Sequence, residues 1–290
     1  MDDSSTSQDS NHEDPADIFF KLANVSMVGF RLDHRDKSIL VHQHTSAQSH
    51  TGGIVWEASY LLAYYLYLKY KDSTSLKSKP LGKLLEVGSG CGMLGLVLAA
   101  FNLCNLAVLT ETTAVIDNLH RNVCLNIQRG IVSADQICSL SLRWDRYKED
   151  ISENKQILTP HSFDTIVGTD VIFSIAFVKP LLKTLRKLSH TTSTILLCVP
   201  IRCEDAYNLF LLKAHHYDLD YTDITQELYD LCPWGSSLEC KLLQLTKTNA
   251  SSALLSIHPS HVTIENRNGH GRKKRQRVRS NDKDPLANCT

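Results

Sequence analysis

Segments with the pattern of buried strands alternate with segments that have the apolar spacing of helices along the middle of the chain. Such alternation predicts a mostly parallel sheet with helices on both faces, because parallel neighbours need a crossover connection that is usually a helix. We therefore expect an α/β fold. The predicted strands are 83–87, 107–110, 137–142, 165–169 and 194–199, and the predicted helices are 93–101, 114–127, 176–188 and 205–214.

Two further strand-like runs follow, at 217–225 and 238–246. The sequence shows no helical pattern between them, so we expect them to pair as a closing antiparallel hairpin. This departure from strict alternation narrows the choice among α/β folds.

Charge and composition divide the chain into one domain and two tails. Residues 1–17 are acidic with no Lys or Arg, and residues 250–290 are polar with a basic run around Lys273 and Lys274. Neither tail can form a core, so we predict that both are disordered and flank one domain at 18–249, expected to be a monomer. The 31 basic and 31 acidic residues balance, so nucleic-acid contact is expected only through the basic tail.

Several classes of protein are disfavoured. The nine cysteines form no C-x-x-C pair, and the acidic start lacks the features of a signal peptide, so we expect reduced thiols and a cytoplasmic or nuclear location. Asn102 and Asn105 interrupt the most apolar stretch, so no membrane span is expected. The histidines lack partners at metal-ligand spacing, so no metal is expected.

A glycine-rich loop directly follows the first predicted strand. Gly88, Gly90 and Gly92 form a G-x-G-x-G pattern before an apolar helix. Glycines at such a turn let backbone N–H groups approach a ligand beyond the carboxyl end of a strand, although they could also serve only to pack a strand against a helix. The spacing differs from that of nicotinamide enzymes, and no Lys follows to meet a phosphate, so a dinucleotide or ATP is disfavoured here.

Polar and aromatic residues follow the next three strands. Glu111 ends the second predicted strand, where a carboxylate can accept hydrogen bonds from a ribose diol or can begin a helix. Trp144 follows the third strand, and Asp170 with Phe173 follows the fourth. The carboxyl ends of parallel strands share one edge of a sheet, so we expect these side chains near the glycine loop.

These motifs together resemble the seven-strand S-adenosylmethionine-dependent methyltransferases, and within them the protein-lysine methyltransferase-like group called methyltransferase family 16. The resemblance covers about residues 52–247. It implies a Rossmann-like fold whose seven-stranded, mostly parallel sheet has a reversed final strand. The motifs are Gly53-Ile54-Val55-Trp56-Glu57, Glu86-Val87-Gly88-Ser89-Gly90-Cys91-Gly92, Glu111, Asn122 to Asn126, Trp144, and Asp170-Val171-Ile172-Phe173, which matches the group's [DE]-x-x-[YF] signature.

The resemblance also implies roles for single residues. Trp56, Thr169 and the loop residues would border S-adenosyl-L-methionine, and the others would hold its parts or shape the place of the methyl acceptor. Thr169 stands where Ala is usual, and Phe173 replaces the more frequent Tyr. The implied cofactor-binding residues are Trp56, Gly88, Ser89, Gly90, Glu111, Trp144 and Thr169, and the implied catalytic residues are Asp170 and Phe173.

Methyl transfer to a lysine of a protein substrate is the activity that the resemblance favours. A lysine must lose its proton before it attacks, and a carboxylate such as Asp170 in an apolar channel could assist. Asp170 could instead cap a strand end, and Phe173 could be a core residue. Because a fold does not fix the acceptor, an RNA or small-molecule methyltransferase and a catalytically silent adaptor remain alternatives.

Overall fold

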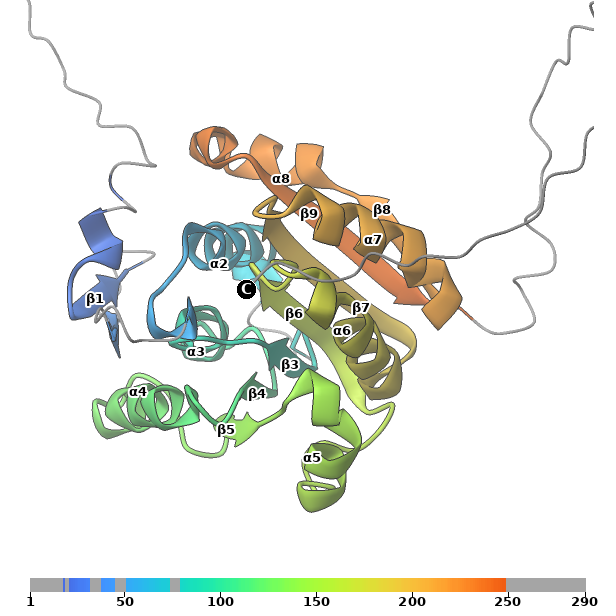
Figure 1. Ribbon diagram of the computed structural model, residues 1–290. Helices are drawn as coiled ribbons and strands as arrows, with labels where there is room; N and C mark the ends of the chain where they lie inside the picture. Colours follow the sequence, from blue (N-terminus) through green and yellow to red (C-terminus); the bar gives the residue numbers. More distant parts are fainter. Residues whose placement is uncertain (1–17, 19–20, 32–37, 45–50, 74–78, 249–290) are drawn as a thin grey trace, which may run out of the picture. The chain divides into compact units, whose positions relative to one another are not determined.

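The structure is a computed structural model that describes residues 18, 21–31, 38–44, 51–73 and 79–248 (Figure 1). The acidic tail predicted at 1–17 and the basic tail predicted at 250–290 lie outside the described residues. The folded part shows the predicted alternation of strands and helices.

Seven strands form one sheet in the order β5-β4-β3-β6-β7-β9-β8. Only β9 is reversed, because it pairs antiparallel with both of its neighbours, β7 and β8, while the other pairs are parallel. The predicted sheet, with its reversed final strand, is therefore confirmed. The strands are β3 (Lys83–Val87), β4 (Leu106–Glu111), β5 (Ile137–Ser141), β6 (Phe163–Thr169), β7 (Ser189–Pro200), β8 (Leu219–Asp223) and β9 (Cys240–Lys247).

Strand order changes direction at β3, which lies between β4 and β6. In an open α/β sheet, this switch point opens a crevice beyond the carboxyl ends of the strands, where ligands bind. The glycine loop follows β3 directly, so it borders that crevice.

Helices cover both faces of the sheet, as predicted (Figure 1). Successive strand residues point to opposite faces, so Leu84 packs in the core beneath α2 and α3, while Leu85 packs in the core beneath α6 and α7. No helix among the described residues has the length and apolarity needed to cross a membrane. The helices are α2 (Glu57–Tyr70), α3 (Met93–Ala100), α4 (Ile116–Gln128) and α8 (Thr225–Leu231) on the first face, and α5 (Tyr147–Glu153), α6 (Ile175–Leu188) and α7 (Glu204–Ala214) on the second.

The last two strands were predicted to be joined directly as a hairpin, and this part of the prediction is wrong. The two strands do pair antiparallel, but α8 and the 3₁₀ helix η5 (Pro233–Leu238) lie between them. Asp223 Oδ1 accepts a hydrogen bond from Thr225 N at 2.9 Å, which turns the chain into α8, and Leu228 is fully buried. Seven helical residues with a single buried leucine carry too weak a period to be seen in the sequence.

A small antiparallel hairpin of β1 (Met27–Phe30) and β2 (Ile39–His42) was not predicted. Two asparagines of α4, one helical turn apart, hold its second strand. Asn122 bonds both backbone groups of His42, at 2.8 and 3.0 Å, and Asn126 bonds both backbone groups of Leu40, at 3.1 and 2.7 Å. The side-chain amides thus bond the backbone N–H and C=O groups on the side of β2 that does not pair with β1.

Candidate active site

One cavity of about 470 Å³ lies at the carboxyl ends of β3, β4, β5 and β6. It contains every residue that the sequence predicted for the site, so the structure brings together side chains that are far apart in the sequence. The predicted residues around it are Trp56, Gly88, Ser89, Gly90, Glu111, Trp144, Thr169, Asp170 and Phe173.

Hydrogen bonds between neighbouring strand ends fix the glycine loop. Ser89 N donates to Thr110 O at 2.9 Å, and Thr110 N donates to Ser89 Oγ at 3.0 Å. The buried Ser89 side chain therefore links the ends of β3 and β4, and the backbone of the loop, not this side chain, can contact a ligand. Gly88 has a φ of +64°, which suits glycine.

The missing side chain at Gly88 also keeps the cavity open. A Cβ at this position would lie 3.2 Å from Trp144 Cζ2 and 3.0 Å from Val171 Cγ1. Trp144 begins the 3₁₀ helix η3 (Trp144–Arg146), and its indole packs edge to face against Phe177 at 6.2 Å between ring centroids. An aromatic face beside an open glycine turn fits the adenine of S-adenosylmethionine.

Glu111 is the last residue of β4, and α4 begins only at Ile116, so the carboxylate does not lie in the first turn of that helix. Glu111 Oε1 accepts a hydrogen bond from Gly90 N at 3.2 Å, and its Oε2 accepts one from Thr112 N. The carboxylate is thus held between the glycine loop and the end of β4. Its position in the cavity fits a role as acceptor from a ribose diol.

Asp170 lies at the other end of the cavity, in a left-handed conformation with a φ of +55°. A non-glycine residue in this region is uncommon, and such strain is concentrated at functional sites. Arg202 Nε and Nη2 donate to Asp170 Oδ2 at 3.1 and 3.0 Å. Asp170 Oδ1 is buried and has no hydrogen-bond partner among the described residues, so one carboxylate oxygen is left to pair with a cation.

Burial raises the pKa of the Asp170 carboxyl above its ordinary value, and the Arg202 guanidinium lowers it in part. The Asp170 side chain is 8% exposed, so its charge depends on this partner. Among the residues that the structure describes, no loop amide donates to the carboxylate, which argues against a strand-end cap. Phe173 is 40% exposed and contacts Phe177 at 5.7 Å between ring centroids, so it is not a core residue.

Arg202 is the functional residue that sequence reasoning missed. It ion-pairs with Glu57 as well as with Asp170, and its guanidinium lies 4.9 Å from the centroid of the Trp56 ring. It therefore ties the start of α2 to the end of β6. The signal was present, because Arg202 stands two residues after Pro200, the last residue of β7, which is a further parallel strand end at the same edge.

Beneath the glycine loop, Glu86 is completely buried, and Gly95 N donates to its Oε2 at 3.0 Å. Burial raises the pKa of Glu86 to about 8. The folded protein therefore keeps Glu86 protonated above pH 4.5, where the unfolded chain ionises, and releases the proton only near pH 8. Glu86 thus stabilises the fold most at low pH, and this contribution falls as pH rises through that window.

We expect Glu86→Gln, which mimics the protonated form, to remove this pH dependence. Relative to the variant, the wild type should lose about 1.4 kcal/mol of unfolding free energy per pH unit between pH 5 and 8. Urea unfolding at several pH values measures the difference, and the exposed Glu149→Gln serves as control. Parallel pH curves for the wild type and Glu86→Gln would contradict the assignment.

Comparison with known proteins points to the same kind of enzyme as the geometry of the site. The sequence profile of the lysine methyltransferase family matches residues 34–216. Protein N-lysine methyltransferase METTL21A of Danio rerio is 28% identical over 172 residues, which are 57% of this chain and 71% of that protein. Protein-lysine methyltransferase METTL21E of Mus musculus is 26% identical over 215 residues, 73% of this chain and 78% of that protein.

A third relative, EEF1A lysine methyltransferase 3 of Xenopus tropicalis, is 25% identical over 164 residues, 57% of this chain and 64% of that protein. The family profile matches more than half of the chain and includes the glycine loop, Glu111 and Asp170. The chain therefore belongs to the lysine methyltransferase family and uses S-adenosylmethionine as its methyl donor.

Proposed function

We propose that this protein methylates a lysine side chain of a protein substrate, and that Asp170 receives the lysine in the cavity. The observation that carries the proposal is the buried Asp170 Oδ1, which has no hydrogen-bond partner in the part of the chain that the structure describes. A lysine ammonium can reach a buried carboxylate because its charge is carried on a long, flexible stem.

S-adenosylmethionine supplies a methyl group that is already activated by its sulfonium. The chain therefore needs no covalent nucleophile, and its residues mainly position the acceptor and exclude water. Asp170 Oδ1 accepts a hydrogen bond from the lysine Nζ and orients it. Desolvation of the ammonium in the cavity favours transfer of its proton to Asp170 Oδ1, which frees the nitrogen lone pair.

The aromatic residues at the mouth suit the same acceptor. Phe173 and Phe177 are 40% and 39% exposed, whereas Phe163 and Phe210 are fully buried. Exposed rings beside a buried carboxylate can pack on the apolar stem of a lysine and attract its cationic head. This arrangement favours an amine on an alkyl chain over a planar base or a hydroxyl group.

The direct test is transfer of tritiated methyl groups from S-adenosylmethionine into an extract by the purified full chain. We expect protease-sensitive label, and acid hydrolysis should release it as methyllysine. Label that is sensitive to ribonuclease, or that remains in the small-molecule fraction, would contradict the proposal.

Arg202 is proposed as a positioning residue that keeps Asp170 ionised. Removing its charge in Arg202→Met leaves Asp170 beside Glu57 alone, so the pKa of Asp170 should rise further. We expect the acid limb of the methyl-transfer pH profile to move up by about one pH unit or more. Arg202→Lys should restore part of the shift, and an unmoved profile in Arg202→Met would disprove this role.

A further inference from the structure

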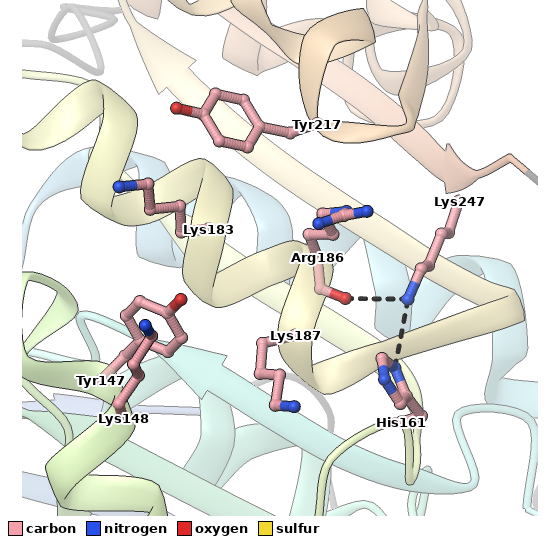
Figure 2. A pocket seen from close by; sticks show the side chains of 8 residues that line it. All are labelled: Tyr147, Lys148, His161, Lys183, Arg186, Lys187, Tyr217 and Lys247. Atoms are coloured by element: carbon pink, nitrogen blue, oxygen red, sulfur yellow. Dashed lines mark hydrogen bonds between the residues drawn. The ribbon is translucent and has the colours of Figure 1, made fainter. Parts of the chain in front are cut away.

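A second cavity, of about 450 Å³, lies on the face of the sheet that α5, α6 and α7 cover. His161 precedes β6, Arg186 lies in the last turn of α6, and Lys247 ends the reversed strand β9, so all three mark the edge where the parallel strands begin. Figure 2 shows the side chains around it. The lining residues come from α5, α6, the 3₁₀ helix η4 (His215–Tyr217), β9 and the segment before β6.

Positive charge dominates this cavity, although the chain as a whole is neutral. Of the charged side chains that line it, none is acidic. Arg186 pairs with Asp218, but Lys148, Lys183 and Lys187 make no ion pair with any residue that the structure describes. Like charges gathered in a hollow repel one another, so this arrangement costs free energy unless an anion compensates it.

Lys247 differs from these three lysines because it is anchored. Its Nζ donates to Arg186 O at 2.9 Å and to Ser189 O at 3.1 Å, and it lies 3.1 Å from His161 Nδ1 (Figure 2). Burial and then the charge of Arg186 lower the pKa of Lys247. The Lys247 side chain is therefore held in place in the cavity, and the neighbouring positive charge contributes to its lowered pKa.

Helix dipoles explain only part of this charge. Arg186 and Lys187 lie in the last turn of α6, where cations are favoured, but Lys183 lies one turn earlier. Lys148 is the second residue of α5, where the helix dipole disfavours a cation. The two lysines that the dipoles do not favour line the same cavity, which points to a ligand.

Two tyrosines complete the cavity from different elements. Tyr147 comes from the start of α5 and Tyr217 from η4, and both are half-buried beside the lysines. Aromatic faces next to lysines suit a base joined to phosphates, and the volume lies in the range of roughly 300–1,000 Å³ that is usual for small-molecule sites. We propose that this cavity binds a nucleoside di- or triphosphate, with its phosphates on Lys148, Lys183 and Lys187.

The test is calorimetric titration of the full chain with ATP in the presence of saturating S-adenosylhomocysteine, which keeps ATP out of the cofactor cavity. We expect one ATP per chain, bound more tightly than inorganic tripolyphosphate because the tyrosines contact the base. Lys183→Glu/Lys187→Glu should weaken ATP binding by about a hundredfold or more, because each of the two lost charged hydrogen bonds is worth at least about tenfold.

A matched control separates this site from general attraction by charge. Arg31→Glu/Arg121→Glu changes the net charge equally, but Arg121 lies on α4 and Arg31 follows β1, both on the other face of the sheet. We expect this variant to bind ATP like the wild type, and both variants to keep wild-type affinity for S-adenosylhomocysteine, which shows that they are folded.

The proposal would be overturned if the wild type did not bind ATP, or if it bound tripolyphosphate as tightly as ATP. It would also be overturned if Lys183→Glu/Lys187→Glu still bound ATP like the wild type, or if the control variant weakened ATP binding equally. An oligouridylate that binds more tightly than ATP and depends on Lys183 would replace the nucleotide with RNA. Because retention of S-adenosylhomocysteine is measured separately, failure here leaves the methyltransferase proposal intact.

Discussion

Asp170→Asn should lower the rate of methyl transfer by about 10²- to 10³-fold while leaving the affinity for S-adenosylhomocysteine within a few-fold of wild type. The variant keeps the size of the side chain but removes the charge that receives the lysine ammonium, and a positioned acid or base contributes about that factor. The separation of rate from binding follows from the place of Asp170, which follows β6, whereas Glu111 ends β4 on the other side of β3. Methyl transfer to the labelled substrate and calorimetry measure the two effects.

Asp205→Asn is the control for this prediction. Asp205 is an exposed carboxylate at the start of α7, at the same edge of the sheet but outside the cavity. Its rate should match that of the wild type. An Asp170→Asn enzyme with undiminished activity would rule out the proposed role and would leave the unpartnered oxygen without a function.

Glu111→Ala should lower the affinity for S-adenosylhomocysteine by about 100-fold or more. Two hydrogen bonds from a ribose diol to a carboxylate are each worth about 1.5–3 kcal/mol, and the variant loses both. It also frees the Gly90 N–H that the carboxylate holds at 3.2 Å, so the glycine loop loses a fixed contact. Calorimetric titration at constant pH gives the loss directly.

Glu111→Gln separates these two contributions. The amide oxygen can still accept from Gly90 N, but the side chain carries no charge and has only one acceptor oxygen, so its affinity should lie between those of the wild type and Glu111→Ala. Affinity in Glu111→Ala equal to that of the wild type would place the ribose elsewhere.

The strand ends that carry the site were predictable because each motif stands directly after an apolar run. Glu111, Trp144 and Asp170 follow three such runs, and parallel strands bring their carboxyl ends to one edge. The roles of the individual side chains were less accessible. The buried hydroxyl of Ser89, for example, accepts a hydrogen bond from the next strand. This contact depends on how deeply the loop is buried, which the motif does not show.

Contacts between distant segments explain what the sequence could not show. Arg202 matters because it meets Glu57 and Asp170, and these three residues come from three different elements. The β1–β2 hairpin depends on Asn122 and Asn126 of α4, whose spacing alone indicates nothing about a partner strand. Long-range side-chain bonds of this kind have no local pattern, so only the folded chain reveals them.

A crystal structure of the protein with S-adenosylhomocysteine tests the central claim most directly. We predict that the ligand occupies the cavity at the ends of β3 to β6, with its ribose on Glu111, its adenine against Trp144, and its sulfur on the side of Asp170 and Phe173. A ligand bound in another cavity, or one whose sulfur is separated from Asp170 by the rest of the molecule, would contradict the account.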